Sequence, residues 1–190
     1  ETKTFVTNSD AHSLPKIARE YNKMLVEDIS FKEVVKALKN EDGRKILANY
    51  GLDPKLGKYH RTHCDNCDST IETKEPVSVC PECGSNKVTF GVFDRIELIK
   101  DKEKSKSPKS RPPYIYQVPL GFIPGVGGKT ITKLLDTFDT EMNILHKLSK
   151  DDIEAVVGEK VAENIVNARE GKMEVQSGGG GVYGKVLAKN

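Results

Sequence analysis

Four cysteines constrain this 190-residue chain more than any other feature of its sequence. They form two C-x-x-C pairs, Cys64 with Cys67 and Cys80 with Cys83, and residues 68–79 separate the pairs. A two-residue gap lets both thiolates of a pair reach the same ion, and two pairs complete a tetrahedral site. Since no cysteine is left over, the pattern predicts a closed, structural zinc site.

Two alternatives to the four-cysteine site stay open. The cysteines could instead form two disulfides, although that pattern belongs mainly to oxidising compartments. His60 and His63 stand just before Cys64, and either imidazole could replace one thiolate ligand. Four cysteines already suffice for a tetrahedral ion, so we expect neither histidine to be a ligand.

The composition indicates a lean hydrophobic core. Only 36% of the residues are hydrophobic, which is typical of small modules that need staples. The sequence contains no run of 18 apolar residues and no visible secretory signal, so we expect a cytoplasmic protein without a membrane partner. The chain begins without methionine, so a fragment or a processed piece is expected.

The net charge of +2 hides an uneven distribution. Residues 100–113, KDKEKSKSPKSRPP, are strongly basic and contain almost no apolar side chain. Such a segment cannot offset the entropy of ordering, and we interpret residues 101–113 as a solvated linker. A linker that also touches phosphates is the alternative.

Residues 1–55 resemble the end of an α/β domain. The patterns predict a buried strand over 4–9, a helix over 15–26 and a strand over 45–50. Ser30 with Glu33 has the spacing of a capping box and opens a predicted helix over 31–39. Its inward residues should be Val34, Val35 and Leu38.

A glycine-rich turn at residues 121–135, GFIPGVGGKTITKLL, is the clearest binding signal outside the cysteines. Gly125 and Gly127 permit unusual backbone angles and leave no Cβ in the way of a ligand. The backbone amides of residues 125–130 should then point outward at a helix N-terminus, which favours a phosphate. Lys129 and Thr130 add a charge and a hydroxyl. A glycine-lined turn without a ligand is the alternative.

This turn resembles the helix–hairpin–helix of DNA-binding proteins that do not read sequence. A second, weaker copy follows, with predicted helices over 151–157 and 161–169 and a capping signature at Ser149 and Asp152. The sequence departs from the pattern in three places. The leading helix of the first copy is at best a turn after Pro119, Ile131 replaces a small residue, and the second turn has only Gly158 beside an acidic Glu159.

The tail is glycine-rich, with Gly178–Gly181 followed by Val182, Tyr183, Gly184 and Lys185. A flexible linker is one interpretation. The other is a loop that approaches nucleic acid with free amides, one aromatic ring and one cation.

Asp10 and His12 stand two residues apart after the first predicted strand. Catalytic groups occupy that end of the strands in α/β barrels, although Asp-x-His alone is a weak signal. The stretch SDAHS followed by KIAREYN resembles the last metal-ligand motif of the polymerase-and-histidinol-phosphatase (PHP) family. Three further stretches, ANYGLDPKLGKYHRTHC, RPPYIYQVPLGFIPGVGGKT and GGGGVYGKV, occur in the same order as in one branch of that family. Together they resemble endonuclease Q over nearly all of residues 4–190.

The resemblance implies an α/β fold with small modules, namely the C-terminal half of such an enzyme. The implied parts are a remnant of the PHP barrel (1–55), a zinc ribbon with its following helix (56–100), the basic linker (101–113), a helix–hairpin–helix region (114–173) and the glycine-rich tail (174–190). The family nicks DNA on the 5′ side of a deaminated base (uracil, hypoxanthine or xanthine) or of an abasic site.

The resemblance also implies the site residues. Asp10 and His12 match two ligands of catalytic divalent ions such as Zn, Mn or Mg, and the remaining ligands would lie on strands absent from this sequence. The implied nucleic-acid contacts are Gly125, Gly127, Gly128, Lys129 and Thr130 in the turn and Gly180, Gly181, Tyr183 and Lys185 in the tail. A sliding clamp is a candidate partner, although the ending LAKN shows no obvious clamp-binding peptide. A non-catalytic nucleic-acid adaptor and a purely structural fragment are the alternatives.

Overall fold

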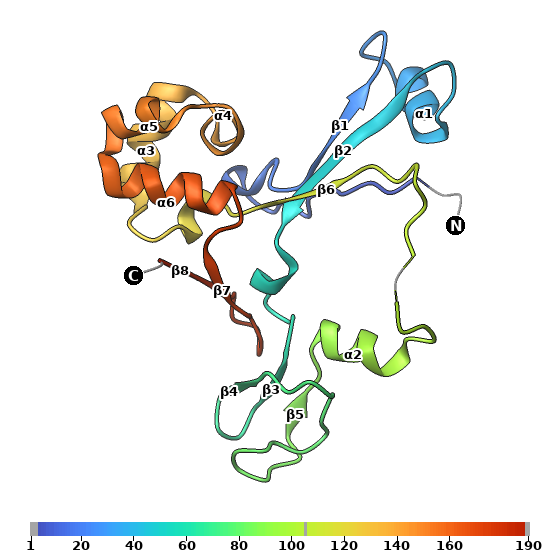
Figure 1. Ribbon diagram of the computed structural model, residues 1–190, viewed down its shortest axis with the longest axis vertical. Helices are drawn as coiled ribbons and strands as arrows, with labels where there is room; N and C mark the ends of the chain where they lie inside the picture. Colours follow the sequence, from blue (N-terminus) through green and yellow to red (C-terminus); the bar gives the residue numbers. More distant parts are fainter. Residues whose placement is uncertain (1–3, 105, 189–190) are drawn as a thin grey trace. The chain divides into compact units, whose positions relative to one another are not determined.

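The computed structural model describes residues 4–104 and 106–188 and contains two compact units. The first unit comprises residues up to Leu52 together with Lys104–Gln117, and the second comprises Asp53–Glu103 and the residues from Val118 onward. Both units mix helices and strands, in agreement with the predicted α/β class (Figure 1). No helix in the described part of the chain is long and apolar enough to cross a membrane.

A three-stranded sheet forms the first unit (Figure 1). Its order is β1 (Tyr21–Leu25), β2 (Lys45–Leu52) and β6 (Tyr114–Gln117), with β1 antiparallel and β6 parallel to β2. The predicted strand over 45–50 is confirmed. The sequence did not predict β6, which extends the sheet at the point where the helical region was expected to begin.

The predicted helix over 15–26 is wrong. Only a 3-10 helix forms, over Leu14–Lys16, and Ala18 then adopts φ 62°, which an α-helix does not allow. Tyr21 begins β1 instead, where its ring stacks on that of Tyr50 with the ring centroids 4.4 Å apart. Burial, and then the neighbouring Tyr50, raise the pKa of Tyr21 to about 12. Pairing with β2 therefore overrides an apolar spacing that is typical of a helix.

The predicted buried strand over 4–9 is also wrong. Phe5 and Val6 are 50% and 39% exposed, and the segment has no strand partner. Its backbone is held by side-chain amides instead. The Asn22 side chain bonds both the N–H and the C=O of Thr7, at 2.8 and 2.9 Å, and Asn49 Nδ2 donates to the Phe5 carbonyl at 3.1 Å.

Helix α1 (Phe31–Lys39) confirms the predicted helix over 31–39, and Ser30 Oγ accepts a hydrogen bond from the Glu33 N–H. The predicted inward face is only partly right: Val34 and Val35 are half-buried and Leu38 is 38% exposed, whereas Glu33 and Ala37 are the fully buried residues. Glu33 does not complete the capping box. It accepts instead from the Glu27 N–H at 3.0 Å and from Arg44 Nε at 2.7 Å.

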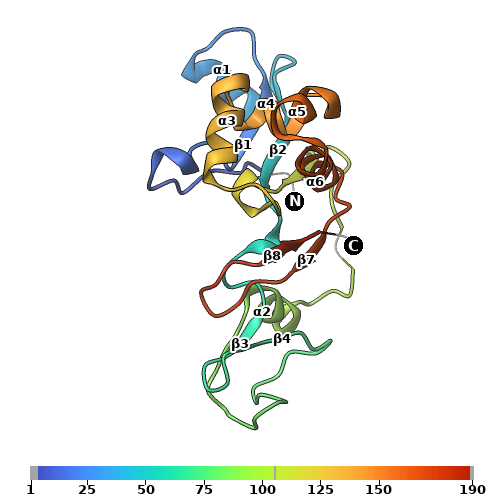
Figure 2. The same ribbon diagram turned by 90° about the vertical axis from the view of Figure 1, so that its left-hand side faces the viewer.

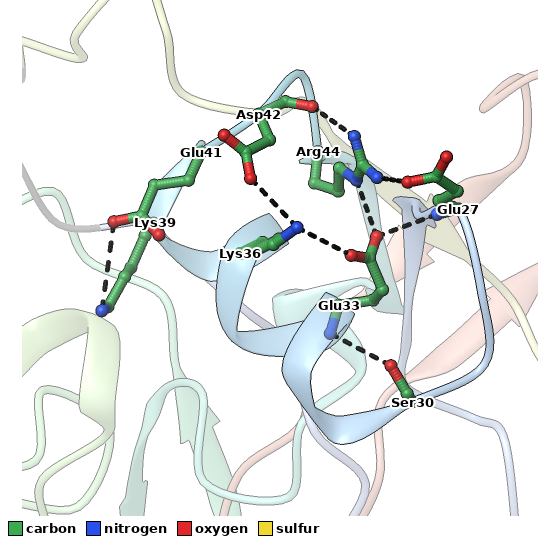
Figure 3. Close-up of polar contacts among 8 residues, drawn as sticks. All are labelled: Glu27, Ser30, Glu33, Lys36, Lys39, Glu41, Asp42 and Arg44. Carbon is green, nitrogen blue, oxygen red and sulfur yellow. Dashed lines mark hydrogen bonds and ion pairs between the residues drawn. The ribbon is translucent and has the colours of Figure 1, made fainter.

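The ion pairs around Glu33 tie α1 to the sheet (Figure 3). Lys36 Nζ lies 3.2 Å from Glu33 Oε1 and 3.0 Å from Asp42 Oδ2, and Arg44 also pairs with Glu27. The bonds to Asp42 and Glu33 raise the pKa of Lys36. A buried carboxylate is costly unless it is paired, so this network replaces the apolar contacts that the sequence predicted.

The second unit contains a small antiparallel sheet, with β3 (Thr62–Cys64) between β4 (Ser69–Ile71) and β5 (Val88–Thr89). The helix α2 (Val92–Ile99) follows and confirms the helix expected after the zinc ribbon. The helix buries a polar residue and exposes its apolar stripe, the reverse of the usual arrangement in an amphipathic helix. Asp94 is buried, whereas Val92, Ile96 and Ile99 on the opposite side are 58%, 53% and 64% exposed.

Four helices complete the second unit (Figure 2): α3 (Gly128–Phe138), α4 (Glu141–His146), α5 (Lys150–Val157) and α6 (Glu159–Arg169). The sequence predicted α3, α5 and α6 but missed α4. Fully buried aliphatic side chains from all four helices form their core, namely Leu134, Ile144, Ile153 and Ile165. The chain then ends in a hairpin of β7 (Glu174–Gln176) and β8 (Lys185–Leu187).

Candidate functional site

The four cysteine sulfurs converge at one end of the small sheet, all within 4.8 Å of one another. The Sγ atoms of Cys64 and Cys83 are 3.7 Å apart, and so are those of Cys67 and Cys80. A disulfide would need about 2.05 Å. A tetrahedral zinc ion with Zn–S bonds of about 2.3 Å requires sulfurs about 3.8 Å apart. The geometry therefore fits a zinc ion and excludes the disulfide alternative.

Local backbone geometry explains how each pair turns its thiols inward. The residue after the second cysteine of each pair is left-handed, with φ 56° at Asp68 and φ 71° at Gly84. Cys64 and Cys80 are buried beside Ile71, and Cys67 and Cys83 are exposed. A backbone hydrogen bond from Cys83 lowers the pKa of Cys80 to about 6, which favours the thiolate that a metal needs.

The two histidines lie outside this group of sulfurs, as expected. His63 Nε2 faces Asp68 Oδ1 at 3.2 Å, and its Nδ1 is buried without a hydrogen-bond partner. The His60 ring packs against Phe93. Burial, followed by the charge of Arg61, lowers the pKa of His60.

A buried carboxylate that the sequence analysis missed joins α2 to the sheet. Asp94 Oδ2 accepts from the Thr62 N–H at 2.7 Å and from Thr62 Oγ1 at 2.8 Å. Asp94 Oδ1 lies 3.2 Å from Arg61 Nη2, and the side chains of Asp94 and Arg61 are 3% and 12% exposed. No local pattern indicates this role, because the apolar spacing of Val92, Ile96 and Ile99 predicts that the other face of α2 is the buried one.

The glycine-rich tail is neither a free loop nor a linker. Four of its amides donate hydrogen bonds within the protein: Gly178 to Lys55, Gly179 to Val182, Gly181 to Lys58 and Gly184 to Leu56. A Cβ at Gly184 would lie 2.5 Å from the Gln176 carbonyl oxygen, so the position has no room for a side chain. The expectation of free amides is therefore wrong for these four residues, because their N–H groups donate to carbonyls of residues 55–58 and of the tail itself.

Tyr183 lies at the surface of this tail, and two groups engage its ring. The Phe122 ring meets it edge-on with the centroids 5.4 Å apart, and Lys58 Nζ lies 4.7 Å from its centroid. Tyr183 is 36% exposed, and Lys185 is exposed. A polar pocket of about 200 Å³ lies between this tail and the ribbon, with His63, Asp68, Thr70, Gln176 and Lys185 among its lining residues.

The Pro124–Gly128 turn differs, because a Cβ at two of its three glycines would face open space, and one at Gly125 would meet Val161 Cγ2 at 3.4 Å. Gly125 adopts φ 83°, and a Cβ at Gly127 or Gly128 would meet no atom within 4 Å. The turn is anchored from behind. Val126 is buried, and the buried Asn164 of α6 donates to the Pro124 carbonyl at 3.0 Å.

The first turn of α3 has no side-chain cap. Gly127 is the N-cap residue and supplies no acceptor. Lys129 is exposed and Thr130 half-buried, and both line a pocket of about 350 Å³ with Lys133 and the last two residues of α5. Lys133, which the sequence analysis did not single out, donates to the Val156 carbonyl. Uncapped amides beside two lysines can bind an anion.

The two helices predicted over 151–157 and 161–169 are present as α5 and α6. Ser149 and Asp152 form a reciprocal capping box, and Gly158, at φ 82°, joins α5 to α6. Glu159 is the first residue of α6. Its negative charge at a helix N-terminus competes with a phosphate, so weaker phosphate binding at this turn stays a prediction.

Asp10 and His12 lie side by side in an irregular segment. His12 Nε2 is 3.3 Å from Asp10 Oδ2, and the two side chains are 81% and 99% exposed. Within residues 4–104 and 106–188, the four cysteines are the single cluster of three or more potential ligands. The structure therefore brings the predicted pair together without adding a third ligand from the described residues.

No protein-family model matches the chain. The uncharacterized protein YqxK of Bacillus subtilis is 50% identical to it over 182 residues, covering 96% of this chain and 46% of that protein. The chain therefore spans less than half of the length of this relative.

Two solved structures match the whole fold. The lesion-specific endonuclease PfuEndoQ of Pyrococcus furiosus matches with a TM-score of 0.82 and 36% identity, over 100% of this chain and 50% of that one. Endonuclease Q bound to a 27-mer duplex with an abasic lesion at the active site matches with a TM-score of 0.81 and 36% identity, over 98% and 50%. The resemblance indicated by the sequence motifs is thus confirmed: this chain matches endonuclease Q over its whole length, which is about half of that enzyme's chain.

Proposed function

We propose that this chain is part of a metal-dependent DNA endonuclease that nicks DNA 5′ of a deaminated base (uracil, hypoxanthine or xanthine) or of an abasic site. The single observation that carries the proposal is the match to two endonuclease Q structures at 36% identity across the whole chain. One of those enzymes is described as lesion-specific, and the other was solved with an abasic duplex. The first unit would then be the end of a PHP-type barrel.

In this proposal Asp10 and His12 are ligands of the catalytic ions. Their atoms lie 3.3 Å apart and are open to solvent, so one ion could contact both a carboxylate oxygen and a neutral imidazole. Zinc, manganese and magnesium all accept part of this donor set. A bound divalent ion would supply an activated water for in-line attack on a phosphodiester. The role of this chain's own residues is to hold that charge beside the DNA backbone.

The α3 turn would hold the DNA backbone. It presents uncapped amides beside Lys129 and Thr130, and nothing occupies the space in front of Gly127 and Gly128. Helix α3 carries a partial positive charge at that end. A phosphate oxygen fits this arrangement without any base contact, so the turn would bind DNA regardless of sequence. Tyr183 and Lys185, at the surface of the tail, would contact the same nucleic acid.

The test uses the full-length gene product and a duplex that carries a single uracil or abasic site. Asp10→Ala should lower the nicking rate at least 100-fold and leave duplex binding unchanged, because it removes a ligand of the catalytic ions but leaves the α3 turn intact. Asp101→Ala, which removes an exposed carboxylate from the basic linker, is the matched control and should nick normally. Normal turnover by Asp10→Ala, or nicking that persists in excess chelator, would contradict the proposal.

A non-catalytic nucleic-acid adaptor is the second candidate. It is favoured by one observation, namely that the described residues place no third ligand beside Asp10 and His12. The same experiment separates the two candidates. An adaptor binds the duplex and leaves it intact in both variants, whereas the endonuclease loses nicking only in Asp10→Ala.

A further inference from the structure

The glycine-rich tail rests on the residues that lead directly into the zinc site. The Arg61 N–H donates to the Gly178 carbonyl at 2.9 Å, and Arg61 and Gly179 form an isolated parallel bridge. One residue further, Gly180 lies against the His63 ring, because a Cβ there would come within 2.6 Å of Cγ and Cδ2. Cys64 follows immediately as the first cysteine of the metal cluster.

A second strand of the ribbon makes the same contact. Thr70 of β4 pairs with His63 of β3, and its Oγ1 lies 3.1 Å from the Cβ position of Gly179. The tail therefore packs on both β3 and β4, and both strands adjoin the first cysteine pair. A Cβ at Gly180 would collide with the His63 ring, and one at Gly179 would be in tight contact, at 3.1 Å, with the Arg61 carbonyl oxygen and Thr70 Oγ1.

Besides the Asp94 contacts to Arg61 and Thr62, the strands beneath the tail are held by a small buried cluster. They are three, three and two residues long, and their buried cluster consists of Cys64, Ile71 and Cys80 with Val77 and Val88 packed on it. Two cysteines thus make up most of the buried core. A sheet of this size needs a staple, and a structural zinc ion contributes its binding free energy as folding free energy.

We propose that the zinc ion at the four cysteines orders the glycine-rich tail, so that the tail is clasped to the ribbon only while the metal is bound. Zinc holds Cys64 and the register of β3 and β4, and these strands present the backbone of Arg61, the His63 ring and Thr70 to Gly178–Gly180. Phe122 and Lys58 engage the Tyr183 ring and Lys185 pairs with Gln176 in the hairpin, so the clasp fixes the Gly178–Gly180 part of the tail on the ribbon. The inference goes beyond the proposed function, because it concerns the fold of the tail and requires neither nuclease activity nor DNA.

The linkage runs in both directions. If zinc favours the clasped tail by a given factor, the clasped tail must favour zinc binding by the same factor. A substitution that opens the clasp without touching a cysteine should therefore weaken zinc retention. Gly180→Ala is such a substitution. Gly171→Ala is its matched control, because Gly171 has a similar φ of 66° against 59° but no atom within 4 Å of its Cβ position.

The experiment is hydrogen exchange, read by mass spectrometry, on the zinc-loaded 190-residue chain before and after zinc is stripped with a chelator. Stripping should raise exchange in residues 176–187 about tenfold or more, together with β3 and β4, and re-added zinc should restore protection. Peptides from α5 and α6 are the internal reference and should not change. A tail that stays protected while β3 and β4 open, or a tail unprotected in the zinc-loaded chain, would overturn the proposal.

The variants supply the reciprocal measurement, zinc loss to a competing chelator. Gly180→Ala should lose zinc roughly fivefold more readily than the wild type, and Gly171→Ala should match the wild type. If all three proteins retain zinc equally well although hydrogen exchange shows the tail of Gly180→Ala to be open, the proposed coupling is wrong. If Gly180→Ala fails to fold, as judged by exchange in α5 and α6, the chelation experiment on the wild type decides alone.

Discussion

Two glycine-rich segments, the Pro124–Gly128 turn and the Gly178–Gly184 tail, carry similar sequences and use glycine for opposite reasons. At Gly127 and Gly128 a Cβ would meet only open space, and no side chain caps the amides of the helix that follows. At Gly178, Gly180 and Gly184 a Cβ would collide with the protein itself. The tail omits side chains because they would not fit, whereas in the turn there is room for them and, under the proposed function, their absence leaves space for a phosphate. The sequence pattern alone does not separate these roles.

The largest effect is expected at Asp94, in the ribbon against which the tail packs. Asp94→Ala should destabilise the ribbon by about 3–5 kcal/mol, because it leaves the Arg61 guanidinium buried without its partner and the Thr62 N–H without an acceptor. The comparison predicts that this loss spreads to the tail and spares the α3 turn, which rests on Val126 and Asn164.

Hydrogen exchange of the ribbon, tail and α3 peptides measures that division. Asp94→Asn keeps the shape and one acceptor oxygen, so an intermediate loss is expected from it. Equal exposure of the tail and the α3 turn in Asp94→Ala would show that the two regions are not independent.

A second test compares the glycines directly. Gly184→Ala should destabilise the protein by about 1–3 kcal/mol, because the new methyl group overlaps the Gln176 and Lys55 carbonyl oxygens and disturbs the bond from its N–H to Leu56. Gly128→Ala should be neutral or stabilising by up to about 1 kcal/mol, since it adds a better helix former at an open position. Urea unfolding of both variants gives the two values. A costly Gly128→Ala would mean that packing, not ligand access, selects that glycine.

The sequence predicted those features whose physics is local. The spacing of Cys64, Cys67, Cys80 and Cys83 reports two turns that each close on one ion, and the Ser149–Asp152 cap involves residues only three apart. The missed helix α4 apart, the failures are long-range. The apolar spacing of Tyr21 and Met24 fits a helix, but pairing with β2 decides for a strand. Residues 4–9 lie extended because Asn22 and Asn49 bond their backbone, and no local pattern announces such bonds.

The candidate sites divide in the same way. Asp10 and His12 could be paired from their spacing alone, and Lys129 and Thr130 follow the turn that positions them. The partners of the tail could not be found, because the amides of Gly178 and Gly184 bond residues more than 120 positions earlier in the chain. Lys58 and Asp94 were missed for this reason. Each acquires its role only when the tail or the ribbon folds back upon it.

A charged substitution in the turn should change DNA binding, whereas a bulkier residue in the tail should change stability. Gly127→Glu should weaken duplex DNA binding about tenfold, or about 1.4 kcal/mol, because it adds a carboxylate where a phosphate would bind. Thermal stability should not change, because the position is open. Gly171→Glu adds the same charge at another open site of the second unit and is the control. Gel-shift titrations of both variants measure the effect, and equal binding by both would remove the turn from the DNA surface.

The smallest expected effect is a pH dependence carried by a histidine in the helical part that supports the turn. Burial, and then the positive charge of Arg169, lower the pKa of His146 below its ordinary value near 6.5. Between that ordinary value and the lowered one, the unfolded chain binds more protons than the folded chain, so stability falls as the pH falls through this window. Above pH 6.5 the histidine is neutral in both states and contributes no dependence.

His146→Gln should therefore flatten the decline in stability of α3–α6 between pH 7 and pH 5, as measured by urea unfolding across that range. If the decline is as steep in His146→Gln as in the wild type, other groups cause the acid sensitivity. The stability of the helices that support the turn would then depend less on pH than that of the tail, because a zinc ion at the four cysteines is lost as its thiolates protonate.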